Sequence, residues 1–364
     1  MTKKLLNNDC VLPRQIAFAA AFLLPTGKLL EAPSLLAERA AGDLLLPALL
    51  HFLLQAGLLW AILYASSTSE KTLFERLEMR LGGGMVVFYV FYALYFLFAA
   101  ILPIFDLEKF IYAAFFDTAP TVFSFTAFFF LSAYVCAKGI KALGRAADLS
   151  AFLFVIPFFA LLLMSLSEAD FTHLLPLFGS KFGDSMSAFT YTTPHFSDVV
   201  LLLPLLGNLR YKKGDGAKIM TGYGVGALST LLFLAVFFGV YSSIAPREHY
   251  AFSKIAEYFP ALSIVGRVDL LFVYLLTIVL LFFTSMPLQY GVDFTCRAIK
   301  TEKRAILSAL LNFVLLLFVF FGNKYYNTIR GIICGKLPII FWLVADLLPL
   351  FLLFLPKEKE KPHA

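Results

Sequence analysis

The sequence predicts an all-α, polytopic membrane protein with about ten transmembrane helices. Of the 364 residues, 60% are hydrophobic and only 15% are charged, whereas about 25% of the residues of a soluble domain are charged. The mean hydropathy is +0.83. Apolar runs of roughly 20 residues, the length that crosses a bilayer, recur along the chain and are separated by short charged loops.

The apolar runs divide a single transmembrane domain, residues 1–364, into a first half at 13–167 and a second half at 186–355. The first run has no small-residue cleavage site after it, so we expect it to remain as an anchor and not to be removed as a signal peptide. The expected spans are 13–37, 44–65, 84–114, 119–137, 150–167, 186–208, 218–244, 264–287, 304–321 and 333–355.

The basic residues predict the orientation of the bundle. Every second connection carries Lys and Arg, and these connections hold roughly two thirds of the basic residues, so the positive-inside rule places both termini in the cytoplasm. The connection with Lys324, Arg330 and Lys336 departs from this pattern. Two charged amphipathic stretches are expected to form a cytoplasmic surface helix at 69–81 and an outer loop helix at 246–262.

The composition argues against several classes of function. The net charge of +6 falls in short loops and marks orientation, so it does not indicate nucleic-acid binding. The four cysteines are far apart and the five histidines are scattered, without metal-ligand spacing. No P-loop, nucleophile elbow or dinucleotide fingerprint is present, and no clustered acids suit chemistry on lipid substrates. We expect no metal, no cofactor and no enzymatic activity.

The sixth segment is interrupted by polar residues and a proline. Pro194 removes a backbone donor and disfavours helix at Thr193, so we expect the helix to stop near Thr193 and to restart with Ser197 or Asp198 as its cap. In hydrocarbon, unpaired backbone groups are tolerated only where they are buried in protein or line a wet cavity. The restarted helix offers N–H groups that suit a carboxylate. The same pattern is also typical of a purely structural kink.

The first segment carries a second interruption, made of Pro25, Thr26, Gly27 and Pro33. Lys28 and Glu31 are three residues apart on one predicted helix face. One interpretation is a kinked helix in which these two charges neutralise each other. The other is that Lys28 or Glu31 faces a cavity and holds a ligand group or a proton.

The interrupted segments are the first and the sixth, which are corresponding members of two five-helix halves. Interruptions at matching places point to an inverted-repeat transporter with a binding site near the membrane midplane. The two halves share no direct residue repeat, so this hypothesis depends on the pattern alone.

Four stretches carry a resemblance to a known family. They are APSLLAERAAGD at 32–43, KGIKALGRAADLSAFLFVIPF at 138–158, LLPLFGSKFGDSMSAFTYTTPHFSDVVLLLPLL at 174–206 and GRVDLLFVYLLTIVLLFF at 266–283. In order and spacing they resemble the permease-like B subunits of bacterial spore germinant receptors, within the amino acid/polyamine/organocation transporter superfamily. The resemblance covers nearly the whole chain. Thr26 and Lys28 stand where the family keeps small residues, and Ser197 and Asp198 stand where it keeps Gly and Glu.

The resemblance implies a LeuT-like fold, a 5+5 inverted repeat with broken helices 1 and 6. It also implies a place beside partner receptor subunits in the inner membrane of a spore, where amino acids or other small nutrients are sensed. A ligand would then lie between the two breaks. The candidate ligand-binding residues are Pro25, Thr26, Gly27, Lys28, Glu31, Thr192, Thr193, His195, Phe196, Ser197 and Asp198.

Alternatives remain open for the function and for single residues. The protein is a nutrient sensor, a working amino acid permease coupled to protons or an ion, or a scaffold for partner subunits that binds no ligand. Asp198 either holds a ligand ammonium or caps its helix. His51 and His195 lack an acid partner in the sequence, which favours packing roles. The other charges within the spans are expected to pair locally or to lie near interfaces: Asp106, Glu108, Lys109, Asp293 and Asp346.

Overall fold

The computed structural model describes residues 11–69, 71–115, 121–175, 179, 182–257 and 269–354. Regular secondary structure within these ranges is helical throughout, which confirms the predicted all-α class. Some of the residues on which the sequence-based predictions depend lie outside these ranges. They are Cys10, the basic residues Lys3 and Lys4 before the first span, the end of the expected outer helix at 258–262, Arg267 in the stretch 266–283 and the basic tail at 357–361.

The first half of the chain folds into alternating long and short helices. In order these are α2 (Pro13–Phe18), the π-helical η1 (Ala19–Leu23), α3 (Leu24–Lys28), α4 (Ala32–Ala40), η2 (Ala41–Asp43), α5 (Leu45–Ser67), α6 (Leu73–Leu81), η3 (Gly82–Gly84), α7 (Met85–Phe115), α8 (Thr121–Lys138) and α9 (Ile140–Ser165).

The second half of the chain also alternates long and short helices. Its elements are η4 (Phe171–Leu174), α10 (Phe182–Phe196), α11 (Asp198–Gly207), α12 (Asp215–Tyr241), η5 (Ser242–Arg247), α13 (Ala251–Glu257), α15 (Asp269–Ile299), α16 (Arg304–Gly322), η6 (Asn323–Tyr325), α17 (Tyr326–Ile333) and α18 (Lys336–Phe354).

Helices of membrane-spanning length are frequent in the described residues. Six stretches are long and apolar enough to cross a bilayer, and a bent pair, Pro13–Lys28 with Ala32–Asp43, adds a seventh with a 61° turn between its halves. Two shorter apolar helices occupy Phe125–Lys138 and Ile339–Phe351. The protein is therefore a multi-pass membrane protein, although not all ten expected spans are continuous helices of spanning length. The six are Leu45–Ser67, Leu73–Ala114, Ile140–Ser165, Asp215–Arg247, Leu270–Ile299 and Arg304–Ile333.

Two helix boundaries differ clearly from those expected from hydropathy. α9 begins at Ile140, although its apolar run was expected to start at 150, and α15 continues to Ile299, although its run was expected to end at 287. Charged residues end the hydrocarbon portion of a span but not the helix, because Lys, Arg and Ala are good helix formers. Gly139, with φ +80°, provides the sharp start of α9.

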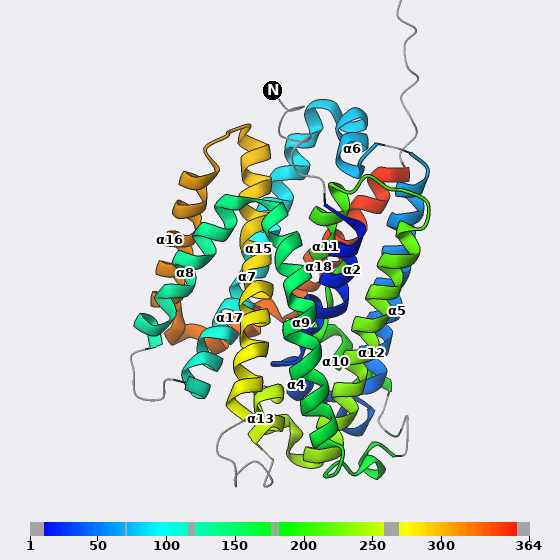
Figure 1. The fold of residues 1–364 in the computed structure, drawn as a ribbon, viewed down its shortest axis with the longest axis vertical. Helices are drawn as coiled ribbons and strands as arrows, with labels where there is room; N and C mark the ends of the chain where they lie inside the picture. Colours follow the sequence, from blue (N-terminus) through cyan, green and yellow to red (C-terminus); the bar gives the residue numbers. More distant parts are fainter. Residues whose placement is uncertain are drawn as a thin grey trace, which may run out of the picture.

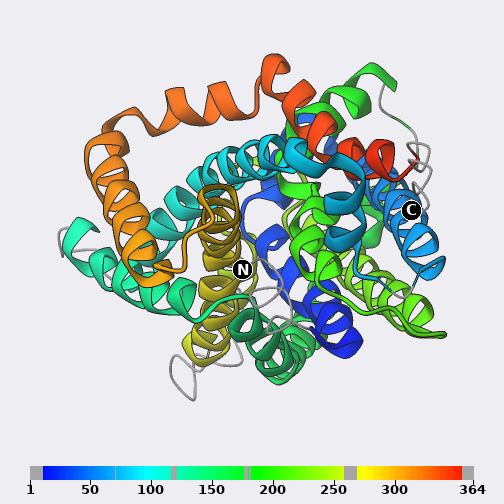
Figure 2. The ribbon, with the colours of Figure 1, turned by 90° about the horizontal axis from the view of Figure 1, so that it is seen from above.

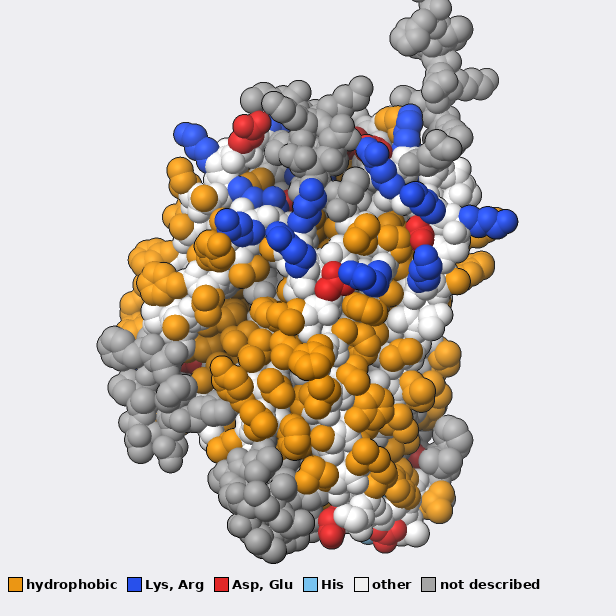
Figure 3. Space-filling view, in the orientation of Figure 1, with side chains coloured by type: hydrophobic (Ala, Val, Ile, Leu, Met, Phe, Trp, Pro, Cys, Tyr) orange, Lys and Arg blue, Asp and Glu red, His pale blue; other side chains and the backbone are white. Residues whose placement is uncertain are grey.

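The long helices run roughly parallel in one bundle, and the interrupted first segment lies in its interior (Figures 1 and 2). α17 is an exception, because both views show it lying across the bundle between α16 and α18. On the face shown in Figure 3, Lys and Arg gather at one end, above a broad apolar band. The surface helix α6, the start of α2 and the end of α18 all lie at this basic end (Figure 1).

α12 packs unusually closely against the first segment and so positions the candidate site. A Cβ atom added to Gly222 would overlap the backbone of Ala17, and one added to Gly226 would overlap the carbonyl oxygen of Ala20. Small residues four apart allow helix backbones to approach in this way within a membrane. Tyr223 lies between the two glycines and is directed into the bundle interior, where it is 3% exposed.

Candidate functional site

The break in the sixth segment lies at Ser197. α10 ends at Phe196, Ser197 has non-helical φ and ψ of −76° and 62°, and α11 starts at Asp198. The expectation that the helix stops near Thr193 is therefore wrong by three residues. Side-chain hydroxyls sustain the last turn around Pro194, since Thr193 Oγ1 donates to the Phe189 carbonyl at 3.0 Å and Ser197 Oγ donates to the Thr193 carbonyl at 3.2 Å.

The break in the first segment lies at residues 29–31, after the expected Pro25–Gly27 stretch. Pro25 and Pro33 each stand in the first turn of a helix, where the missing N–H costs nothing. The carbonyl groups of Leu29 and Leu30 accept hydrogen bonds from the first two residues of α13, at 3.1 and 2.9 Å. The loop helix α13 thus supplies the backbone partners that this break needs in a membrane.

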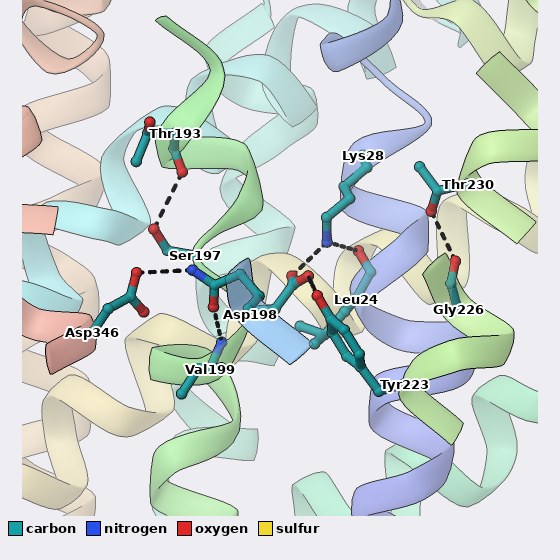
Figure 4. A network of polar contacts seen from close by, with 11 residues as sticks. Leu24, Lys28, Thr193, Ser197, Asp198, Val199, Tyr223, Gly226, Thr230 and Asp346 are labelled. Carbon is teal, nitrogen blue, oxygen red and sulfur yellow. Dashed lines mark hydrogen bonds and ion pairs between the residues drawn. The ribbon is translucent and has the colours of Figure 1, made fainter. Parts of the chain in front are cut away.

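The two breaks are joined by an ion pair. Lys28 Nζ, at the end of α3, donates to Asp198 Oδ1, at the start of α11, at 2.5 Å. Both side chains are about 2% exposed. Tyr223 donates to the other carboxylate oxygen at 3.1 Å, and Lys28 also donates to the Leu24 carbonyl at 3.4 Å (Figure 4). The positive and negative ends of one buried pair therefore come from the two interrupted segments.

Lys28 and Glu31 do not neutralise each other, so that interpretation of the first segment is wrong. Glu31 Oε2 instead accepts from Arg330 at 3.1 Å and lies 3.3 Å from His249 Nδ1. A three-residue spacing brings side chains together only if the helix continues, and here the helix breaks between them. Arg330, which departed from the charge pattern of the loops, thus has a buried acidic partner on the first segment.

Asp198 does not cap its own helix, and the Ser197 side chain makes no capping hydrogen bond. The cap comes from α5, because Gln55 Oε1 accepts the N–H of Val199 at 2.9 Å. The amide nitrogen of Gln55 donates to Asp346 Oδ2 at 2.9 Å, so one buried side chain links α5, α11 and α18. Gln55 is not among the residues predicted from the sequence, where its only signal is a lone amide in an apolar helix.

The two histidines near the breaks differ in their surroundings. His51 is stacked between Phe189 and Phe196, with ring centroids 3.9 and 4.6 Å away, and its Nε2 is 2.9 Å from the Phe189 carbonyl oxygen. This geometry agrees with the predicted packing role. His195 Nε2 is buried and has no hydrogen-bond partner within the described part of the chain, which the packing interpretation does not explain.

A small cavity lies beside the breaks. Its lining includes Gly27 of the first segment, Pro194 and His195 of the sixth, and Asp106 of α7. The cavity measures about 30 Å³, which is enough for a water molecule, whereas small-molecule pockets measure roughly 300 Å³ or more. The structure is therefore closed around this point.

The predicted site residues do not form one group. Lys28, Phe196 and Asp198 meet, since Lys28 Nζ also lies 5.5 Å from the Phe196 ring centroid, while Gly27 and His195 line the cavity. Glu31 faces a separate cluster with Arg330. The hydroxyls of the others donate to carbonyl groups one turn back in the same segment: Thr26, Thr192, Thr193 and Ser197. Pro25 instead packs near Gly226.

The remaining charges within the spans have local partners, as predicted. Asp293 pairs with Arg297, at 2.9 Å, and with Arg304. Near the other end of the bundle, three contacts involve α7: Tyr326 to Asp106 at 2.7 Å, Asn323 to Glu108 at 3.1 Å, and Lys109 Nζ over the Tyr326 ring at 4.3 Å.

Comparison with known proteins identifies the family. The sequence profile of the family described as spore germination protein, a permease-like family and not an enzyme family, matches residues 16–326. No curated protein matches the chain. The matched range runs from α2 into α17 and includes both interruptions and the Lys28–Asp198 pair. The chain therefore belongs to the spore permease family of spore germination proteins.

Proposed function

We propose that the protein is a transporter-like, nutrient-sensing subunit of a spore germinant receptor, and that it binds an amino acid between its two interrupted segments. The observation that carries this proposal is the buried ion pair between Lys28 and Asp198. Taking two charges out of water costs several kcal/mol per ion, and apolar residues of similar volume are often as stable. A pair in the membrane interior is therefore better explained by a role in binding.

The pair has the charges that a zwitterion needs. An ammonium and a carboxylate from the two breaks offer one partner to each end of an amino acid, so a ligand carboxylate would bind Lys28 and a ligand ammonium would bind Asp198. Tyr223 donates to Asp198 and would help to orient it. The unpartnered Nε2 of His195, in the adjacent cavity, supplies a further polar contact.

Binding requires a change of conformation, because the cavity of about 30 Å³ admits water but no amino acid. A ligand shifts such an equilibrium only by binding the open state better than the closed one. In this proposal the Lys28–Asp198 pair stabilises the closed state, and the ligand compensates both charges when the segments separate. The signal to partner subunits is this change in population.

The proposal includes a LeuT-like 5+5 repeat of ten spans. In it, the six long helices, the bent first segment, α8, the α10–α11 pair and α18 would each serve as a span. The basic end seen in Figure 3 would face the cytoplasm, together with both termini. The inner membrane of the spore and the partner receptor subunits follow from the family resemblance.

The test is thermal stability in nanodiscs against a panel of amino acids, nucleosides and sugars. A ligand that binds only the folded protein stabilises it by about 2.7 kcal/mol at a hundredfold excess over its dissociation constant. We expect one amino acid to stabilise the parent but not Lys28→Met or Asp198→Asn. Lys218→Met, which removes an exposed lysine of α12, serves as the matched control. Equal stabilisation of all variants, or no stabilisation of a folded parent, would contradict the proposal.

The alternative is a working amino acid permease coupled to protons or an ion. A buried Lys and Asp in direct contact are favourable for it, because proton relays in membranes use such groups. Uptake of the stabilising amino acid into liposomes, with and without a pH gradient, separates the two functions. A sensor binds the amino acid but does not concentrate it inside the liposomes. A permease does concentrate it, and in the Asp198→Asn variant the pH gradient should no longer increase this uptake.

A further inference from the structure

A second and larger cavity lies beside the first break, in the half of the molecule away from the basic end. α4, α10, η5 and α17 border it, and it measures about 230 Å³. Its lining is largely polar and includes Ser34, Tyr191, His249, Asn327 and Arg330. Figure 1 places α4 and α13 far from the surface helix α6, so this outer cavity faces the side opposite the basic loops.

Arg330 offers N–H donors at the outer cavity that could bind an anion. Its side chain is 15% exposed. One terminal nitrogen donates to Glu31 Oε2 at 3.1 Å and the other donates to the Tyr326 hydroxyl at 3.4 Å. A guanidinium carries five N–H donors in a planar fork that suits carboxylates, and within the described part of the chain the other donors of Arg330 have no partner.

The charges around Arg330 favour an anion further. His249 lies half exposed at the cavity, and its Nδ1 is 3.3 Å from the same Glu31 oxygen that Arg330 contacts. One carboxylate is therefore the partner of both basic side chains. Glu38, an acidic residue of the lining, lies 3.8 Å from Arg39. With His249 protonated, three of the side chains at and beside the cavity are positive (Arg39, His249 and Arg330) and two are negative (Glu31 and Glu38).

The same cluster reaches the small cavity between the breaks. Tyr326, which accepts from Arg330, donates to Asp106 at 2.7 Å, and Asp106 lines the small cavity. Glu31 lies in the break of the first segment itself. A ligand that binds Arg330 thus competes with Glu31 for the guanidinium, directly at the break that must move.

We propose that the outer cavity is a binding site for the carboxylate group of a dissolved small molecule, held by Arg330 in place of its contact with Glu31. The proposal deepens the proposed function and rests on it for the identity of the ligand as an amino acid. In this proposal Arg330 binds the ligand's carboxylate first, before the ligand reaches Lys28 and Asp198. Release of Glu31 then frees the break in the first segment.

The test measures charge preference inside the cavity with thiol reagents. Asn327 lines the cavity on α17 and is exposed, whereas its neighbour Thr328 is exposed but does not line it. Asn327→Cys and Thr328→Cys in nanodiscs are reacted with anionic sulfonatoethyl methanethiosulfonate and with neutral methyl methanethiosulfonate. The parent protein, in which Cys136, Cys296 and Cys334 are buried, gives the background rate.

We compare the rate of reaction with the anionic reagent to the rate with the neutral reagent. This ratio should be on the order of tenfold higher at position 327 than at 328, because clefts lined by one sign of charge concentrate counter-ions. Adding Arg330→Gln should remove the difference, and adding Glu31→Gln should increase it by freeing the guanidinium. The double change Glu31→Gln with Arg330→Gln removes one charge of each sign and so controls for the change in net charge and for folding. Acetate and L-alanine should slow the reaction at 327, and L-alaninamide, which has no carboxylate, should not.

Equal ratios at the two positions, a ratio that survives loss of Arg330, or equal protection by L-alaninamide would overturn the proposal. Its failure is distinguishable from failure of the proposed function. Lys28→Met and Asp198→Asn remove the inner pair but leave Arg330 in place, so they should keep the charge preference at position 327. If that preference holds while no amino acid stabilises the protein, the outer site stands and the inner site fails.

Discussion

Lys28 and Asp198, which are 170 residues apart in the sequence, form a buried contact of 2.5 Å at the two points where membrane helices are interrupted. Each break alone would leave a charge in a low-dielectric interior, where an isolated ion is strongly unfavourable. Together the two segments neutralise each other. The ion pair therefore couples the position of α3 to that of α11, and any separation of these helices exposes both charges at once.

Removing one member of this pair should be far more harmful than removing both. We expect Lys28→Met or Asp198→Leu alone to lower the free energy of unfolding by about 3–5 kcal/mol, because the remaining charge is left buried without a partner. The double variant should recover most of the loss, since the two apolar side chains need no compensation. Unfolding in detergent mixtures, followed by helix content, measures all three.

The exposed Lys218 provides the comparison for this cycle. Lys218 lies 3.7 Å from Asp215 and is 67% exposed, so Lys218→Met should change the free energy of unfolding by less than about 1 kcal/mol. If the single buried variants lose no more than Lys218→Met, the ion pair does not hold the two segments together.

The Gln55 side chain should matter more than its uncharged character suggests. Gln55→Ala removes the cap of α11, so that the Val199 N–H loses its partner and the Asp346 carboxylate loses one of its hydrogen bonds. We therefore expect a loss of about 2 kcal/mol or more. Asp346→Asn keeps an oxygen that accepts from Gln55, and should cost much less. Thermal unfolding of the two variants in nanodiscs gives the comparison. Equal losses would show that Gln55 has no special role.

Two glycines of α12, two residues apart, should respond in opposite directions to the same substitution. Gly226→Ala would place a methyl group against the backbone of Ala20, and the required shift should destabilise the protein by about 1–3 kcal/mol. Gly224 has no heavy atom within 4 Å of the new methyl position, so Gly224→Ala should stabilise the helix by about 0.5–1 kcal/mol. Midpoints of thermal unfolding decide this, and two shifts of the same sign would contradict the close packing of α12.

Much of the fold could be predicted because it depends on local chemistry. Apolar runs give the long helices, and Pro194 with its polar neighbours predicts a break within four residues of the observed one. Segment lengths are less predictable, since a span made of two half helices, such as α10 and α11, is shorter in each part than a continuous one. α17 lies across the bundle, and only the unexpected charge of Arg330 hinted at it.

The partners of the site residues could not be predicted, because they depend on tertiary contacts. The spacing of Lys28 and Glu31 allowed a mutual pair as one of two interpretations, but the break between them turns each towards a different helix. Asp198 was singled out by its charge within a span, whereas Tyr223 and Gln55 had no signal beyond their residue type. A charged Asp or Lys stands out in the sequence of a membrane span. The neutral side chain that forms a hydrogen bond with it does not.

His249 should make stability depend on pH near neutrality. Its hydrogen bond to Glu31 raises the pKa of the imidazole, and this effect outweighs burial and the nearby Arg330, which lower it. A group whose pKa is raised on folding contributes its full stability below the unfolded pKa of about 6.5. That contribution is lost as the pH rises through the higher pKa of the folded state. The difference in unfolding free energy between the parent and His249→Gln should therefore be largest below about pH 6.5 and should shrink above it. Glu31→Gln should abolish this pH-dependent difference, and a difference that grows with pH would show that His249 is not bound to Glu31 in its charged form.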